Sequence, residues 1–398
     1  MASNPQTFTA LTEASSFGAV RISPELDGRA GTNRATGNRP QIAATTDIDA
    51  ITAWLARFMD SPNTFSNYRK EAERLLLWST LALHKPVSSL THEDLLAYQH
   101  FLSDPQPAAQ WIMRAGRKVG RTHTDWRPFA GPLAPTSRRL AITILNSMFS
   151  WLVTAGYLAG NPLSLSRQRA RKAKPRITRY LDDEAWSEVK LAINALPRDS
   201  DREREHYFRL RWLFSLLYLS GLRISEVTKN DMGSFFCQRD KDGEERWWLE
   251  VTGKGEKTRI VPATKELMAE LACYRREKGL APFPNPDETT PLLLPIGRQT
   301  RALTRAAVHT IVKQAFKSAA NQIRARGDDF ESKAQRVEQA SAHWLRHTAG
   351  SHMANNQVDL RHVRDNLGHE SISTTNTYLH SSDNLRHHET EEHHKIHW

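Results

Sequence analysis

The sequence is poor in cysteine and has no long apolar run. Only two cysteines occur among 398 residues, Cys237 and Cys273, which excludes a disulfide scaffold or a cysteine-rich zinc site. The longest apolar stretch, 212–219, is interrupted by Ser215 and is much shorter than the roughly 18 residues of a membrane span. The N-terminus also lacks the charged and apolar regions of a secretory signal. We therefore expect a cytoplasmic protein that does not associate with a membrane.

Acidic side chains are outnumbered by basic ones. The chain has 55 Lys and Arg against 44 Asp and Glu, a formal net charge of +11, which suits a polyanionic partner such as nucleic acid. Charge alone is a weak argument, because many basic proteins bind no nucleic acid. The sequence also lacks the carboxylate cluster that a Mg²⁺ site needs. We expect no metal and no cofactor.

Helical periodicity dominates the N-terminal part of the chain. Residues 1–42 are rich in small and polar residues without sustained periodicity, so we expect a flexible leader there. Beyond it, apolar residues recur at three- and four-residue steps in four segments. These segments begin near Asp47, Thr64, Thr91 and Thr136. They predict a small four-helix domain over residues 43–165.

Two basic stretches accompany this domain. The loop 114–135 carries basic residues beside Trp126 and Phe129, and it is either a solvated insertion or an arm that touches a DNA backbone. The stretch 166–178 is a basic linker between folded segments, and a strap across DNA phosphates is the favoured interpretation. The candidate DNA contacts are Arg117, Lys118 and Arg121 in the loop and Arg167, Arg169, Arg171, Lys172, Lys174 and Arg176 in the linker.

The C-terminal part, residues 179–398, combines helices with a short sheet. A buried helix is expected through 208–219, closed by Gly221. The spacing of the apolar residues then changes, and the new pattern predicts an antiparallel meander of three strands separated by two turns. The strands are expected at 235–238, 246–251 and 259–261, and helices follow at 264–277 and 304–323. The fold class is therefore mainly α with a small antiparallel β-sheet, an α+β protein.

Several side chains of this part suit chemistry on a phosphodiester. Arginine and histidine can hold a phosphate and move a proton, and a tyrosine hydroxyl can act as nucleophile. Taken singly, each such residue is more often a cap, an ion-pair partner or a packing residue. Their order along the chain makes them look connected. They are Arg223, Lys254, His343, Arg346, His369 and Tyr378.

This order resembles the phage integrase family of tyrosine recombinases. The resemblance covers roughly residues 45–385, and the N-terminal helices are similar to the family's core-binding domain by pattern alone. The motifs lie in the C-terminal part. They are Leu219 to Val227 for the first-arginine box, Val251 to Pro262 for the hairpin lysine, His343 to His347 for the His-x-x-Arg box, Leu367 to Ser371 for the third basic position, and Tyr378 for the nucleophile.

The resemblance implies a site-specific recombinase that cuts and rejoins DNA strands through a 3′-phosphotyrosine at Tyr378, for integration, excision or resolution of a mobile element. Arg223 and Arg346 would stabilise the charged transition state. His343 would take the tyrosine proton and Lys254 would protonate the leaving oxygen. His369 would donate to the phosphate, and Glu226 would orient the basic residues.

The implied partners are double-stranded DNA with a specific recombination site and three further copies of the chain in a synaptic homotetramer, which accessory proteins can join. The protein would then be cytoplasmic and associated with the nucleoid. The histidine-rich tail after Tyr378 is interpreted as a contact to a neighbouring protomer or as disorder, in preference to a metal site.

Two other functions stay open at this point. A type IB topoisomerase would use the same residues but would relax DNA without a target sequence. A non-catalytic DNA-binding factor would keep the basic surface but would not need the full set of catalytic positions.

Overall fold

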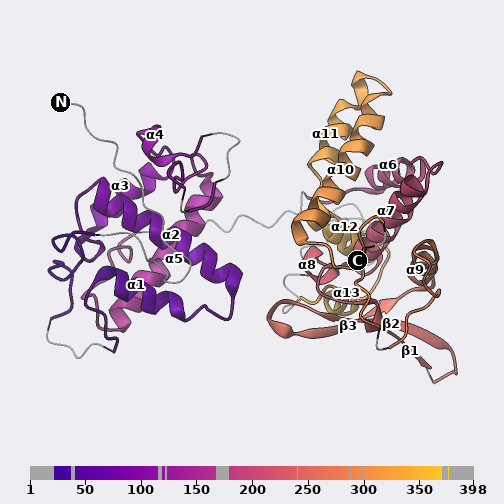
Figure 1. Cartoon of the computed structure of the whole chain (residues 1–398), viewed down its shortest axis with the longest axis horizontal. Helices are drawn as coiled ribbons and strands as arrows, with labels where there is room; N and C mark the ends of the chain where they lie inside the picture. The colour runs from indigo at the N-terminus through magenta and orange to yellow at the C-terminus, as the bar shows by residue number, and fades with distance from the viewer. Residues whose placement is uncertain are drawn as a thin grey trace, which may run out of the picture. The chain divides into compact units, whose positions relative to one another are not determined.

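The computed structural model describes residues 22–36, 41–114, 119–121, 123–166, 179–239, 241–286, 288–297, 299–369 and 375, with Lys254 described by its backbone alone. The chain divides into two compact units, Met1–Arg171 and Lys172–Trp398, each of which is described by itself. Both are largely helical, and the second contains a three-stranded sheet (Figure 1), which confirms the predicted fold class. In the described part of the chain, no helix is long and apolar enough to cross a membrane.

The N-terminal unit is built from amphipathic helices around one core. Thr46 and Thr91 begin two of them with capping boxes, which satisfy backbone N–H groups that have no partner inside the helix. The second helix begins at Pro62, before the predicted start at Thr64, because proline fits the first turn of a helix. The helices are α1 (Asp47–Ala56), α2 (Pro62–Leu81), α3 (His92–Phe101), the short and unpredicted α4 (Ala108–Trp111), and α5 (Pro135–Thr154).

Part of the expected leader packs against this unit. Arg34 forms an antiparallel bridge with Leu158, and the Asn33 side chain donates to the Gly160 carbonyl at 2.8 Å. Gly28 approaches α1 so closely that a Cβ atom there would lie 2.3 Å from the Asp47 carboxylate. Residues 22–36 therefore belong to the folded unit, although their composition predicted a flexible segment.

The described portions of the basic loop 114–135 are attached to α2. Arg121 forms an ion pair with the buried carboxylate of Glu73. Arg74 donates from Nε to the Pro128 carbonyl at 3.0 Å, and its guanidinium lies 4.5 Å from the centre of the Phe129 ring. These contacts attach the loop to α2 at Arg121 and again at Pro128 and Phe129.

The sheet of the C-terminal unit is a meander of β1 (Phe235–Arg239), β2 (Glu245–Thr252) and β3 (Thr258–Ala263), as the sequence predicts. Leu249 of β2 lies opposite Phe235 and Val261, and all three side chains are buried in the core of the unit. Lys254 to Glu256 form the turn between β2 and β3.

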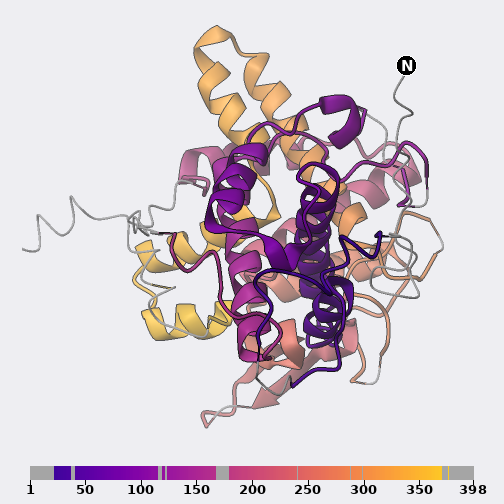
Figure 2. The same cartoon turned by 90° about the vertical axis from the view of Figure 1, so that its left-hand side faces the viewer.

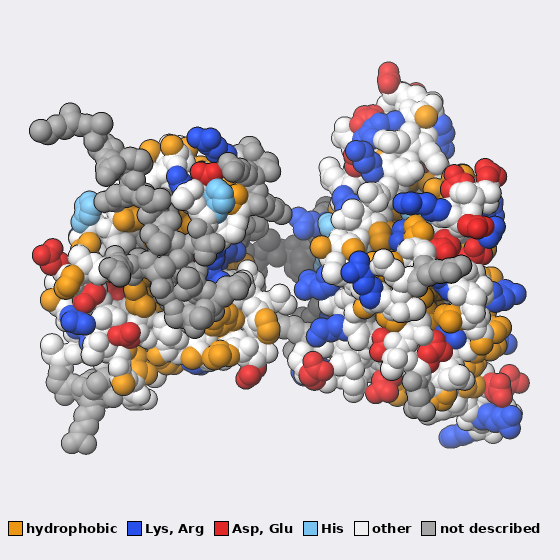
Figure 3. All heavy atoms as spheres, in the orientation of Figure 1, with side chains coloured by type: hydrophobic (Ala, Val, Ile, Leu, Met, Phe, Trp, Pro, Cys, Tyr) orange, Lys and Arg blue, Asp and Glu red, His pale blue; other side chains and the backbone are white. Residues whose placement is uncertain are grey.

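Helices pack around this sheet and extend away from it. Helices α10 and α11 form a hairpin that projects from the rest of the unit in both cartoon views (Figures 1 and 2), and acidic side chains lie at its tip (Figure 3). The sequence did not predict α11, because only Ala334 and Val337 of this polar helix are buried. The helices are α6 (Asp183–Asn194), α7 (Asp201–Leu219), α8 (Ile224–Val227), α9 (Lys265–Glu277), α10 (Arg305–Arg324), α11 (Glu331–Gln339), α12 (Ala342–Asn355) and α13 (Leu360–Leu367).

Candidate active site

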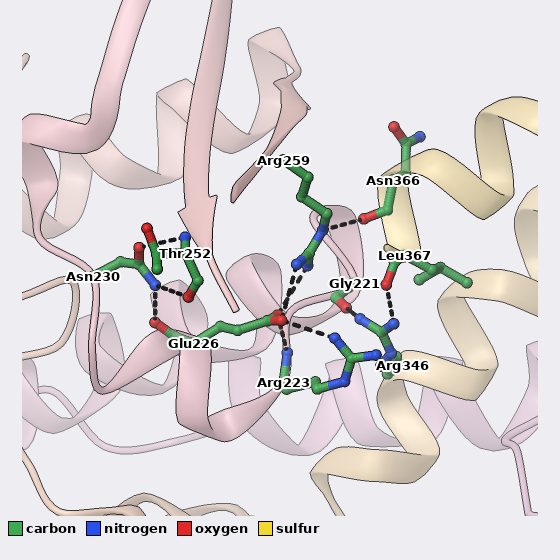
Figure 4. A network of polar contacts seen from close by, with 9 residues as sticks. All are labelled: Gly221, Arg223, Glu226, Asn230, Thr252, Arg259, Arg346, Asn366 and Leu367. Atoms are coloured by element: carbon green, nitrogen blue, oxygen red, sulfur yellow. Dashed lines mark hydrogen bonds and ion pairs between the residues drawn. The ribbon is translucent and has the colours of Figure 1, made fainter. Parts of the chain in front are cut away.

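A buried carboxylate, Glu226, lies at the centre of a polar network in the C-terminal unit (Figure 4). Helix α7 ends before Gly221, whose φ of +59° lies in the left-handed region that glycine adopts at little cost. The chain then turns into α8, with Arg223 as its N-cap. Glu226 accepts hydrogen bonds of 2.9 Å from both the backbone N–H and the Nη1 group of Arg223.

Arg259 of β3 binds the same carboxylate. Its Nη1 and Nη2 groups donate to the two oxygens of Glu226, each at 2.9 Å, in the parallel arrangement that suits a guanidinium. Burial raises the pKa of Glu226, but the hydrogen bonds and charges of Arg259 and Arg223 outweigh burial and lower it to about 2. The carboxylate is therefore ionised at any pH near neutrality.

Arg346 is held by backbone carbonyls. This residue lies in α12, and its side chain is buried. Its Nη1 group donates to the carbonyl of Gly221 and its Nη2 group to the carbonyl of Leu367 (Figure 4). The guanidinium thus connects the segment after α7 with the last residue of α13.

Three histidines lie close to these arginines. Desolvation lowers the pKa of His343, and the charges of Arg346 and Arg223 add to the effect. Desolvation and the charge of His343 lower the pKa of His347 to about 4, and the Nε2 atoms of the two rings are 2.9 Å apart. Both imidazoles are therefore neutral at pH 7, a state in which each can accept a proton.

His369 follows Gly368 at the end of α13. Desolvation, together with the charges of Arg346 and Arg223, lowers its pKa to about 4. Its Nδ1 atom lies 3.1 Å from the hydroxyl of Thr375. With that hydroxyl as donor to Nδ1, the neutral ring carries its proton on Nε2 and can donate there to an anion.

The structure brings together five of the predicted site residues, Arg223, Glu226, His343, Arg346 and His369. The backbone of Lys254 lies in the β2–β3 turn. The side chain of Lys254, Tyr378, the loop residues Arg117 and Lys118, and the six basic linker residues lie outside the described part of the structure. Within that part, no three His, Cys, Asp or Glu side chains come together as metal ligands would.

Two members of the network were not predicted from the sequence, Arg259 and Asn230. The side chain of Asn230 donates to the carbonyls of Glu226 at 2.8 Å and Thr252 at 3.2 Å, and so joins the end of α8 to the end of β2. A signal for Arg259 was present, because strand alternation places it on the same face as the buried Val261. An arginine on a buried face needs an acidic partner.

Comparison with known proteins agrees with these motifs. Residues 187–384 match the sequence profile of the phage integrase family. The tyrosine recombinase XerD of Rickettsia conorii is 26% identical to this chain over 318 residues, which cover 79% of this chain and 92% of the relative. XerC of Xanthomonas campestris pv. campestris is 26% identical over 362 residues, 90% of this chain and 91% of the relative. The chain contains a phage integrase domain.

Solved structures support the same fold for this tyrosine recombinase. XerH bound to a palindromic difH substrate aligns with a TM-score of 0.57 at 17% identity, over 84% of this chain and 80% of XerH. The integrase of the Tn1549 transposon, in complex with transposon right-end DNA, aligns with a TM-score of 0.54 at 14% identity, over 87% of this chain and 99% of the integrase. The resemblance predicted from the sequence is confirmed, and the chain is an enzyme of the tyrosine recombinase class.

Proposed function

We propose that this tyrosine recombinase cleaves and rejoins DNA at a specific site through a covalent 3′-phosphotyrosine at Tyr378. The observation that carries the proposal is the cluster of Arg223, Arg346 and neutral imidazoles around one buried carboxylate in the C-terminal unit. This cluster combines fixed positive charge with groups that can accept or donate a proton, as chemistry on a phosphodiester requires.

In the proposed reaction, the hydroxyl oxygen of Tyr378 forms a bond to phosphorus, and the bond from phosphorus to the 5′ oxygen breaks. Negative charge builds up on the two non-bridging oxygens, and Arg223 and Arg346 would stabilise it. Glu226 fixes Arg223, and two carbonyls fix Arg346. Because both guanidinium groups are held before DNA binds, little reorganisation remains to be done during the reaction.

Two proton transfers accompany this step. A tyrosine hydroxyl has a free pKa of about 10, so the proton of Tyr378 needs an acceptor, and we assign that role to the neutral imidazole of His343. Lys254 would give a proton to the leaving 5′ oxygen, and His369 would donate a hydrogen bond to the phosphate. In the reverse step, a 5′ hydroxyl attacks the phosphotyrosine, so rejoining needs neither ATP nor a metal ion.

The proposed partner is double-stranded DNA in the cytoplasm, with a homotetramer in the synaptic complex. XerH and the Tn1549 integrase are bound to DNA in their solved structures, which supports this choice of partner. The linker residues from Arg167 to Arg176, together with Arg117 and Lys118, would contact phosphates. Arg121 differs from them, because it would have to leave the buried carboxylate of Glu73 to reach DNA.

The proposal is tested in two stages. First, DNA that the wild-type protein traps covalently in its native host is purified and sequenced, which identifies the target site. Second, a nicked suicide substrate with this site is given to wild-type protein and to Tyr378→Phe. We expect a covalent adduct with the wild type alone, and equal DNA binding by both proteins.

A matched control is Tyr180→Phe. Tyr180 is half-buried, and the hydrogen bond that it accepts from Arg336 goes to its backbone carbonyl, which the substitution keeps. It should form the adduct like the wild type. An adduct that persists in Tyr378→Phe would contradict the assignment of the nucleophile. Relaxation of a plasmid without the target site would favour a topoisomerase, and an unaffected Lys254→Ala variant in cells would favour a non-catalytic factor.

A further inference from the structure

The side chain of Arg259 connects its own strand to two helices. It projects from β3, its two terminal nitrogens donate to Glu226 at the end of α8, and its Nε group donates to the carbonyl of Asn366 in α13 at 3.1 Å (Figure 4). Its side chain is only 13% exposed. An arginine in this position connects elements to one another and is poorly placed to bind a ligand directly.

Gly368 gives a second, independent sign of this connection. A Cβ atom at position 368 would lie 2.8 Å from Cδ of Arg259 and 3.1 Å from its Nε, so the side chain of Arg259 runs directly along the backbone there. Gly368 also has a φ of +59°, which disfavours other residues. The residue that follows is His369, so Arg259 supports the backbone from which this imidazole projects.

Arg223 and Arg259 share Glu226 unequally. Arg259 takes both carboxylate oxygens, whereas the side chain of Arg223 makes one bond of 2.9 Å to Oε1. The Arg223 side chain is 40% exposed. Arg259 thus holds the carboxylate in one orientation, and that carboxylate in turn holds the exposed arginine.

We propose that Arg259 is a positioning residue of the recombinase reaction, which sets Arg223 through Glu226 and His369 through the backbone at Gly368. This inference rests on the proposed function. Arg259 also lies in the strand that follows the turn of Lys254. The guanidinium group of Arg259 therefore sets the placement of the β2–β3 hairpin. It also sets the placement of Arg223, the arginine proposed to bind the phosphate.

The substitution Arg259→Lys separates positioning from charge. Lysine keeps the positive charge and a long side chain, but a single ammonium group cannot make two parallel bonds to a carboxylate and a third to a carbonyl. Glu226 would keep a counter-ion but would lose its fixed orientation. A displacement of about 1 Å in a reacting group can cost roughly 100-fold in rate.

The test compares single-turnover cleavage of two suicide substrates, one with an ordinary scissile phosphate and one with a methylphosphonate there. The methylphosphonate lacks one charged non-bridging oxygen, so its cleavage depends less on Arg223. We expect Arg259→Lys to slow cleavage of the phosphate by roughly 10- to 100-fold and cleavage of the methylphosphonate by a much smaller factor. DNA affinity should be unchanged.

Arg275→Lys is the matched control. Arg275 also binds a carboxylate with both terminal nitrogens, at 2.7 and 3.0 Å from Glu288, and its Nε group also donates to a carbonyl, that of Ala281. Arg275→Lys should lower thermal stability but should leave cleavage of both substrates by the folded protein unchanged. Equal slowing by Arg259→Lys, or no slowing at all, would overturn the positioning role. Failure of the proposed function itself would appear separately, as a wild-type protein that forms no adduct.

Discussion

Glu226 and Arg259 are joined by two parallel hydrogen bonds of 2.9 Å, although 33 positions separate them along the chain. The same carboxylate also binds Arg223. One ionised side chain therefore serves as counter-ion to two arginines from different elements, and its removal should have consequences for both folding and chemistry.

We expect Glu226→Gln to destabilise the protein by about 3 kcal/mol or more, because it leaves Arg259, whose side chain is only 13% exposed, without a counter-ion. Urea unfolding measures this loss, and the suicide substrate measures adduct formation, which should fall as well. Glu288→Gln breaks the similar pair with Arg275 and serves as control, since it should reduce stability but leave adduct formation by the folded protein unchanged. A Glu226→Gln protein as stable as the wild type would contradict the role given to this carboxylate.

Gly368→Ala should reduce adduct formation, because its Cβ atom would displace Arg259. Gly279→Ala is the control, since Gly279 has a similar φ of +70° but a Cβ atom there would meet no atom of the described residues within 4 Å. Backbone strain should cost each variant about 1–2 kcal/mol, measured by urea unfolding. Any loss of stability and of adduct formation in Gly368→Ala beyond that in Gly279→Ala reports the contact with Arg259. Equal stability and equal adduct formation in the two variants would argue against that contact.

Acid should destabilise the folded protein partly through its histidines. The pKa values of His347 and His369 are lowered to about 4, whereas an unfolded histidine titrates near 6.5. Between pH 6.5 and 4 the unfolded state binds protons that the folded state does not, so stability falls as the pH is lowered through this window. Above pH 6.5 both states are neutral and the contribution disappears.

The variant His347→Gln isolates this effect in thermal melts recorded from pH 7.5 to pH 4. Its melting temperature should fall less steeply with acid than that of the wild type. The melting temperature of the variant minus that of the wild type should therefore increase as the pH is lowered below 6.5. Carboxylates titrate in both proteins and largely cancel from the difference. Parallel curves over the whole range would show that His347 does not contribute.

Arg121→Ala should lower the stability of the N-terminal unit, because it leaves the buried Glu73 without its ion-pair partner. We expect little change in the salt dependence of DNA binding. Arg117→Ala should instead reduce the slope of log affinity against log salt by about 0.9, the value for one lost phosphate contact. A similar reduction in Arg121→Ala would show that Arg121 leaves Glu73 to bind DNA.

The sequence predicted the site residues that belong to recognisable motifs. It also predicted the helices and strands whose apolar residues recur at a regular spacing. Arg223 and Arg346 stand in recognisable boxes, and the strands of the meander alternate with turns between them. Residues 22–36 were misjudged, because their attachment depends on backbone contacts and on the close approach of Gly28 to Asp47, which composition does not report.

The role of Arg259 could not be predicted for a related reason. Strand alternation places its side chain inward, but the acidic residue that meets it comes from α8, 33 positions earlier. Only the packing of α8, β3 and α13 decides that partner. Arg121 is a similar case. The sequence predicted that it contacts DNA, whereas in the structure it forms an ion pair with the buried carboxylate of Glu73.

The carbonyl contacts of Arg346 bear on attempts to redesign such an enzyme. Its guanidinium binds the carbonyls of Gly221 and Leu367, so a side chain without a hydrogen-bond donor at this position would leave two buried acceptors unpaired. A library selected for altered chemistry would retain arginine at this position for folding alone, whatever the new reaction required. Arg223, with its partly exposed side chain, is the arginine at which directed evolution has room to act.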